Sequence, residues 1–228
     1  SSLAITAVNV PAQTDTRVSL PVTRQAVGSF EIATSGISGN TVTLDSASFD
    51  TDAFPSNSQG NPLFYARFTS GDLEGRWFNI VGNGTNAVSL NVEDSGNPAD
   101  LSAANDGDTL TIYPHWTLGT AFPPGLEGLS FIETPGPTNL KTQILLPDSD
   151  QVATNKSPAA TFIFNAQVGG WLNLNGLLAS NDVVLPPQSF FVVRNVGQGA
   201  PSAKDDPSTL VDESRDEQPT LIRLLALC

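Results

Sequence analysis

Apolar and polar residues alternate with a period of two along most of the chain, in short runs bounded by Gly, Asn and Asp. Runs of this kind are typical of β-strands joined by tight turns. The turn Gly82-Asn83-Gly84 between two such runs indicates a hairpin. The strands expected in the first half of the chain are 41–44, 64–68, 77–81, 87–92 and 109–113.

The second half of the chain has longer and more apolar runs, and the N-terminal segment is similar to them. The strands expected there are 3–10, 142–147, 160–164, 171–174, 189–194 and 220–227. No segment combines a helical spacing of apolar residues with helix caps. The closest, 172–179, is short and carries two Asn and one Gly. The pattern therefore predicts an all-β fold.

Two distant segments share the pattern Thr-x-β-branched-x-Leu-Pro, at 15–21 and 141–147. Similar strands can occupy equivalent places in one sheet. This predicts a discontinuous, jelly-roll-like β-sandwich built from residues 1–25 and 114–228, with residues 26–113 inserted as a small β-barrel domain. A coincidence between two short β motifs is the alternative.

The composition excludes several classes of partner. The net charge is −13, from 23 acidic and 10 basic residues, so nucleic acid is not an expected partner because phosphate binding needs cationic side chains. No apolar run approaches the ~20 residues of a membrane-spanning helix. Residues 197–219 are acidic and poor in apolar residues, and they are expected to form a solvated loop.

The chain contains no methionine and begins at Ser1. We therefore expect a cleaved signal peptide and an extracellular or cell-surface location, with a chain trimmed for another reason as the alternative. The single cysteine, Cys228, cannot form an internal disulfide. A bridge between two chains and a natural chain that continues past Cys228 both remain open.

Several segments together resemble a known family. They are 15–22 (DTRVSLPV), 74–80 (EGRWFNI), 106–112 (DGDTLTI), 116–123 (WTLGTAFP), 141–147 (KTQILLP) and 190–195 (FFVVRN). Over roughly residues 15–195 the chain is similar to uncharacterised secreted β-rich proteins of Verrucomicrobia and related bacteria. The most specific motif is 116–123. The resemblance implies export and supplies no catalytic residue, and the acidic 197–219 segment departs from the family pattern.

The residues that could support catalysis are few. His115 is the only histidine, and no Gly-x-Ser-x-Gly motif supplies a nucleophile for it to activate. We expect His115 to be a packed residue after a strand, and the protein not to be an enzyme. The usual zinc sites draw three or four ligands from His and Cys, and this chain has only one residue of each type. No cofactor is expected.

Closely spaced acidic residues are weak candidates for a calcium site, because Ca²⁺ binds clusters of oxygen ligands. The candidates are Asp50 and Asp52, Asp106 and Asp108, and Asp148 and Asp150. Turn formation is the favoured alternative for each pair, because Asp and Gly are common turn residues.

These observations predict a non-catalytic extracellular structural protein that forms a homo-oligomer or polymer, such as a surface filament, fibre or layer. Terminal strands can complete the sheet of a neighbouring subunit. The residues expected to mediate assembly are Leu3, Ile5, Ala7, Val8, Val10, Leu221, Leu224 and Leu227. Pairing of the terminal strand within its own chain is the alternative.

Two other functions are kept open. A polysaccharide or cell-wall binding module would use exposed tryptophans, for which Trp77, Trp116 and Trp171 are candidates, although their apolar context favours core packing. A secreted hydrolase would need two carboxylates facing each other across a cleft.

Overall fold

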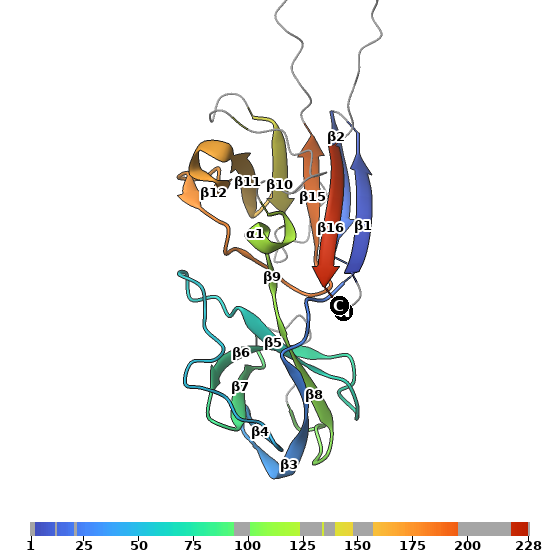
Figure 1. Cartoon of the computed structure of the whole chain (residues 1–228), viewed down its shortest axis with the longest axis vertical. Helices are drawn as coiled ribbons and strands as arrows, with labels where there is room; N and C mark the ends of the chain where they lie inside the picture. Colours follow the sequence, from blue (N-terminus) through green and yellow to red (C-terminus); the bar gives the residue numbers. More distant parts are fainter. Residues whose placement is uncertain are drawn as a thin grey trace, which may run out of the picture.

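The computed structural model describes residues 3–11, 13–20, 22–93, 101–123, 134, 140–147, 157–195 and 220–227, with the backbone alone described for 3–9, 166 and 220–227. It has two parts, a closed barrel below and a layered sheet arrangement above in Figure 1. The predicted all-β class is confirmed. α1 (Leu118–Ala121) is a single turn and η1 (Ala166–Val168) a short 3₁₀ segment.

The barrel closes through six antiparallel strands in the order β3-β4-β7-β6-β5-β8. The strands are β3 (Gly28–Ser38), β4 (Thr41–Leu44), β5 (Phe64–Phe68), β6 (Trp77–Asn83), β7 (Ala87–Asn91) and β8 (Thr109–Pro114). Alternate positions point inward, so Val42 and Leu44 of β4 are buried while their neighbours are partly exposed. They pack with Phe68, Phe78 and Ile112 in one apolar core. The small barrel expected from the sequence is confirmed.

Above the barrel lies a six-stranded sheet in the order β13-β12-β11-β10-β15-β2. The strands are β2 (Thr14–Ser19), β10 (Thr142–Leu146), β11 (Ala160–Asn165), β12 (Gly170–Asn173), β13 (Leu178–Ala179) and β15 (Phe190–Asn195). The two segments with the shared Thr-x-β-branched-x-Leu-Pro pattern become β2 and β10, which pair with opposite edges of β15. Val18 and Ile144 occupy the same position in that pattern, and both side chains are buried in the core.

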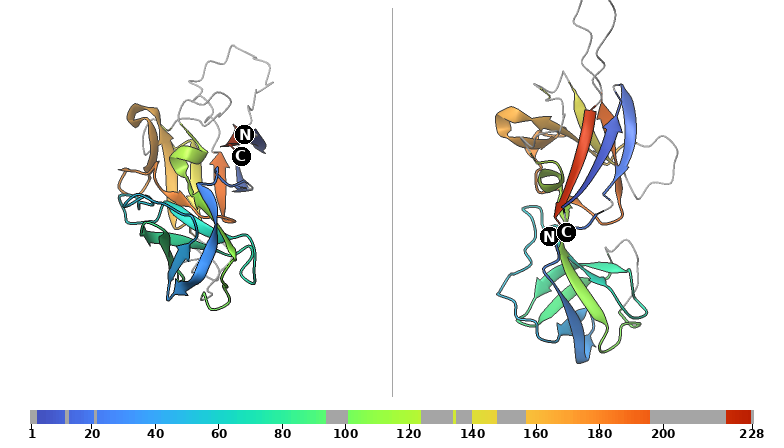
Figure 2. Two further views of the ribbon diagram at one scale, coloured as in Figure 1. Left: turned by 60° about the horizontal axis from the view of Figure 1, so that its bottom comes forward. Right: turned by 45° about the vertical axis from the view of Figure 1, so that its right-hand side comes forward.

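A second layer covers one face of this sheet. It contains α1, the short pair β9 (Trp116–Thr117) and β14 (Val184–Leu185), and a separate two-stranded ladder of β1 (Leu3–Val10) and β16 (Thr220–Leu227). Leu118, Leu185 and Val10 pack with Trp171 and Val193 in one core, which gives the upper part a sandwich-like arrangement. Figure 2 shows β1 and β16 side by side, with the two ends of the chain close together.

Candidate binding cleft between the barrel and the sheet layers

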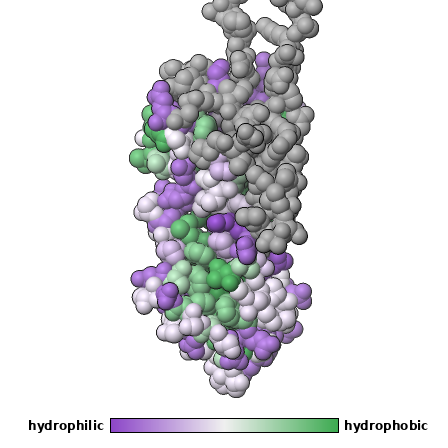
Figure 3. All heavy atoms as spheres, viewed as in Figure 1, coloured by the Kyte–Doolittle hydropathy of each residue, from purple (hydrophilic) through white to green (hydrophobic). Residues whose placement is uncertain are grey.

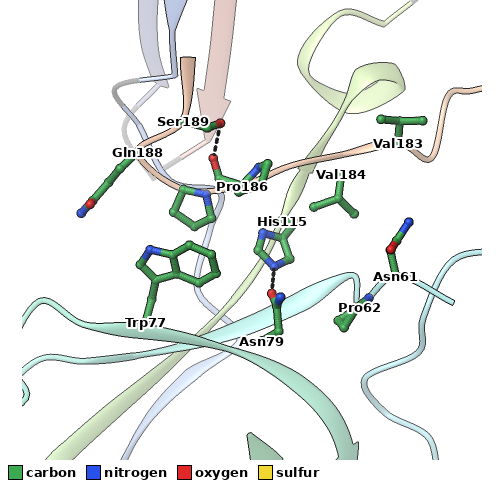
Figure 4. Close-up of a pocket in the computed structure, with 11 residues that line it drawn as sticks. Asn61, Pro62, Trp77, Asn79, His115, Val183, Val184, Pro186, Gln188 and Ser189 are labelled. Carbon is green, nitrogen blue, oxygen red and sulfur yellow. Dashed lines mark hydrogen bonds between the residues drawn. The ribbon is translucent and has the colours of Figure 1, made fainter. Parts of the chain in front are cut away.

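A cleft of about 610 Å³ lies where the barrel meets the upper layers (Figure 4). One wall comes from the barrel, with Trp77 and Asn79 of β6 and the Asn61-Pro62 segment before β5. The opposite wall comes from residues 183–189, which contain β14 and the turn that leads into β15. His115 lies between the walls, in the connection from β8 to β9.

His115 is held from the barrel side. Its backbone N–H donates to the Leu63 carbonyl oxygen at 2.8 Å, and Nε2 lies 2.8 Å from Oδ1 of Asn79. Because an amide oxygen can only accept, Nε2 carries the proton and donates it to Asn79. The carbonyl oxygen of His115 accepts from the Arg24 guanidinium at 3.2 Å. These contacts fix the position and the tautomer of the ring.

The other ring nitrogen, Nδ1, is the one buried side-chain polar atom without a hydrogen-bond partner in the part of the chain that the structure describes. The His115 side chain is 1% exposed, and burial lowers its pKa to about 4. The ring is therefore neutral near pH 7. In the Nε2–H tautomer, Nδ1 is a hydrogen-bond acceptor that no group of the described chain satisfies.

Aromatic side chains surround the histidine on the barrel side. The centroid of the Tyr65 ring lies 4.7 Å from that of His115 and 5.8 Å from that of Trp77. The Tyr65 ring also stacks on Tyr113, with 5.4 Å between the centroids. Burial raises the pKa of Tyr65, so its hydroxyl stays protonated. The aromatic cluster thus packs against His115 from the barrel side.

The turn at residues 186–189 lies between the cleft and a second cavity of about 340 Å³, and residues 186–188, Trp77 and His115 line both. The Ser189 N–H donates to the Pro186 carbonyl oxygen at 3.3 Å, and Gln188 has φ = +62°. In this turn Pro187 holds the second position, and Gln188, with a left-handed backbone, holds the third. This combination defines a type II turn, in which the third position normally holds Gly or Asn. Gln188 is thus an unusual choice at the rim of the cleft.

Further hydrogen bonds hold the two parts of the molecule together around the cleft. The Trp116 indole N–H donates to the Val22 carbonyl oxygen at 2.8 Å. From the barrel, the Asn57 amide and the Ser58 hydroxyl donate to the backbone oxygen and the carboxylate of Asp182, at 3.1 and 3.0 Å. The two walls are therefore fixed to each other by contacts at several points.

The acidic pairs proposed for calcium do not converge. Asp50 and Asp52 are exposed, and no group of three or more His, Cys, Asp or Glu suited to a metal occurs among the described residues. The Asp106 carboxylate accepts from the Ser35 N–H at 2.9 Å, and the Asp108 carboxylate accepts from the Asn105 N–H at 2.8 Å. The Asp108 bond thus closes the 105–108 turn, and the Asp106 bond joins this turn to Ser35 of β3. The residues Asp148 and Asp150, and the acidic segment 197–219, lie outside the described residues.

The three tryptophans serve the interior and the junction. Trp171 is 1% exposed, and its indole N–H donates to the Phe122 carbonyl oxygen at 3.1 Å. Trp77 is 5% exposed and forms part of the barrel wall of the cleft, while Trp116 is partly exposed and its indole N–H is bound to the Val22 carbonyl oxygen. They do not form an exposed platform for stacking on a polysaccharide.

The residues proposed for assembly lie on the β1–β16 ladder, and none of them is among the described residues that line the cleft. Leu3 is opposite Leu227, and the pairing continues without a shift to Val10 opposite Thr220. The N-terminal strand therefore pairs with the C-terminal strand of its own chain.

Sequence reasoning missed the residues that surround His115. Asn61, Asn79 and Gln188 come from three segments that are far apart in the sequence, and no local motif connects them. The one available signal was His115 itself, a lone histidine that directly follows an apolar strand.

No known protein family, curated protein or solved structure matches the chain. No helix among the described residues has the length and apolar character needed to cross a membrane.

Proposed function

We propose that the protein is a non-catalytic extracellular structural subunit, and that its copies polymerise by exchanging strands of the β1–β16 ladder. The observation that carries the proposal is the ladder itself, in which eight residue pairs join the first strand of the chain to the last. The same residue pairs can form between two copies, in competition with the ladder within one chain, when the local concentration of copies is high.

The sequence of β16 favours such a role. Leu221, Leu225 and Leu227 fall at one set of alternating positions, and Ile222, Leu224 and Ala226 at the other, with Arg223 as the only charged residue. A strand that is apolar at both sets is typical of one covered on both faces. In the described part of the chain the ladder has two strands, and a two-stranded ladder is marginal by itself.

Strand exchange between chain ends would build an open polymer. If β16 of one copy pairs with β1 of the next, each copy uses two different surfaces, and such heterologous contacts form filaments unless they close into a ring. Residues 196–219 separate β15 from β16. A chain of that length can span up to ~80 Å when extended, which is enough to reach a neighbouring subunit.

A second observation also supports assembly. Apolar residues are exposed on the side of the six-stranded sheet that is farther from β2. Leu178 in the edge strand β13 is 63% exposed, Leu177 directly before it is 46% exposed, and Val168 at the end of η1 is 61% exposed. Figure 3 shows apolar surface in the region of β12. Apolar residues beside an open strand edge are a typical contact surface for another chain.

The surroundings of His115 support a non-catalytic role. Its ring contacts an amide and aromatic rings, and among the described residues no carboxylate or nucleophile hydrogen-bonds to it. A histidine base in a catalytic triad needs a nucleophile on one nitrogen and an orienting acid on the other.

A disulfide across the ladder tests whether strands are exchanged. Ala4 and Ala226 are direct partners, so Ala4→Cys with Ala226→Cys, in a Cys228→Ser background, places two thiols within bridging distance. Oxidation of assembled protein should give covalent multimers on a non-reducing gel. In protein oxidised as a dilute monomer, the disulfide should hold β1 and β16 of the same chain together. This protein should not assemble until it is reduced.

The matched control is Ala4→Cys with Leu221→Cys in the same background, because Leu221 pairs with Asn9, five residues along the strand from Ala4. This variant should not cross-link. Assembled protein that oxidises only to covalent monomers would show that the ladder stays within one chain. If electron microscopy of the concentrated or native protein shows no ordered polymer at all, the structural role itself is wrong.

A further inference from the structure

We propose that the cleft around His115 binds a neutral carbohydrate, with His115 Nδ1 accepting a hydrogen bond from a sugar hydroxyl. This site is separate from the β1–β16 ladder, so it does not depend on how the subunits assemble. It would give a surface protein a specific contact with a glycan.

The lining of the cleft is uncharged, which selects against ionic ligands. Its side chains are amides, one hydroxyl, prolines, valines, Trp77 and the neutral imidazole of His115. An anionic or cationic ligand would lose hydration without gaining an opposite charge. The volume of about 610 Å³ falls within the range of small-molecule sites, and it exceeds the ~30 Å³ share of one water molecule by far.

The unpartnered Nδ1 is the observation that points to a hydrogen-bond donor. Asn79 fixes the proton on Nε2, so Nδ1 can only accept. Nδ1 is itself buried, and its edge of the ring lies against the wall formed by Val184 and Pro186 (Figure 4), so a ligand hydroxyl reaches it only when this wall shifts. A buried acceptor without a donor is unfavourable, and a ligand that supplies an O–H at this position removes that penalty on binding.

The remaining lining matches both faces of a sugar. Pyranose rings present apolar C–H patches and hydroxyls that donate and accept, and the cleft offers apolar surface from Trp77 and Pro62 beside the amides of Asn61 and Gln188. Gln188 keeps a long amide side chain at a left-handed position (φ = +62°) where Gly would be the less strained residue. The side chain is therefore a candidate contact to ligand rather than a requirement of the turn.

The single histidine makes the site directly observable. Selective ¹⁵N labelling of histidine gives one imidazole, whose two nitrogens report protonation and hydrogen bonding by NMR. The probes are neutral di- and tetrasaccharides built on glucose, galactose, mannose and N-acetylglucosamine, with an oligogalacturonate as the charged counterpart. At least one neutral sugar should shift the Nδ1 resonance toward the hydrogen-bonded value, with a saturable dependence on concentration.

Two variants test the walls without disturbing the fold. Gln188→Gly keeps the turn and removes the amide, and Asn61→Ala removes an exposed amide whose backbone makes the local turn contacts. Each should weaken sugar binding about fivefold, the loss expected for one hydrogen bond. Gln167→Ala, which alters an exposed amide in η1 that does not line the cleft, should leave binding unchanged.

Each outcome decides the proposal. Saturable binding that both cleft variants weaken and the control does not supports it. An Nδ1 resonance that is already hydrogen-bonded in the free protein and does not move with any sugar shows that water occupies the site, and the proposal is then wrong. Equal binding by wild type and both cleft variants, or a preference for the charged oligomer, also overturns it.

Discussion

Asp15 of β2 and Arg194 of β15 lie directly opposite each other and form a two-point ion pair, with Nε to Oδ1 at 2.8 Å and Nη2 to Oδ2 at 2.7 Å. The pair joins the edge strand of the six-stranded sheet to its neighbour. Because the two residues are 179 positions apart, the contact links the beginning and the end of the described sheet.

Removal of this ion pair should have a small effect on stability. Both side chains are nearly half exposed, and exposed pairs contribute about 0.2–1 kcal/mol. A double-mutant cycle with Asp15→Asn and Arg194→Gln, followed by urea unfolding, measures the coupling. The hydrogen bond from Arg194 lowers the pKa of Asp15, so the contribution should be present above pH 4 and lost as the carboxylate is protonated in acid. A coupling well above 1 kcal/mol would contradict this assignment.

Protonation of His115 should destabilise the protein below pH 6.5. Burial lowers its pKa in the folded state to about 4, so between pH 6.5 and 4 the unfolded chain binds a proton that the folded chain excludes. The groups around the ring, Tyr65 and the Arg24 guanidinium at its backbone oxygen, supply no negative charge to offset this. The loss should be about 2 kcal/mol at pH 5 and about 3 kcal/mol at pH 4.

The measurement is the free energy of unfolding of wild type and His115→Gln at several pH values between 7 and 5. The difference between the two should shrink as the pH falls, because only the wild type carries the titrating ring. Parallel curves would show that His115 titrates with an ordinary pKa.

Truncation of Trp171 should strongly destabilise the upper layers. Its ring packs against Phe122 and Phe164 at 6.1 and 5.6 Å, and its side chain is 1% exposed. Trp171→Ala creates a large cavity and should cost about 3–5 kcal/mol. Leu178→Ala, at a 63% exposed position in the same sheet, is the control and should change the free energy of unfolding by less than about 0.5 kcal/mol.

The Asp108 carboxylate should stabilise the folded protein through its hydrogen bond and not by binding a metal ion. Asp108→Asn keeps an oxygen that can accept from the Asn105 N–H, whereas Asp108→Ala removes it and should cost about 1 kcal/mol. Thermal unfolding with calcium and with EDTA should give the same response in wild type and Asp108→Asn. A calcium-dependent rise in the wild-type midpoint that Asp108→Asn abolishes would assign calcium to this pair.

The strands were predictable from the sequence because their signals are local. The expected ranges 41–44, 64–68 and 220–227 coincide with β4, β5 and β16, since period-two alternation and flanking turn residues suffice to define a strand. The 11-residue β3 escaped prediction because a bulge between Ile32 and Ile37, with Ser35 at φ = +53°, interrupts its alternation. The one-turn α1 and the short β9, β13 and β14 also escaped prediction. Their few residues are too short for a periodic pattern, and they depend on contacts such as the bond from the Leu118 N–H to the Val183 oxygen at 3.0 Å.

The cleft could not be predicted for a related reason. His115 and Asn79 are 36 positions apart, and the wall that faces them begins at Val183. Asparagine and glutamine are common in turns, so nothing in the local sequence separates Asn61 and Gln188 from ordinary loop residues. Asn61 and Gln188 come to line the same cleft only because the barrel closes and is oriented against β14.

The chain enters the barrel after Val22 and leaves it at Trp116, and the hydrogen bond between these two residues brings the two crossings together. A segment whose ends lie side by side can be exchanged for another without lengthening or reordering the strands of the host sheet. The barrel is thus inserted at a point where a different insert could take its place. Related chains can be expected to keep the sheet and its terminal ladder while they carry inserts of different size, or none, at this one position.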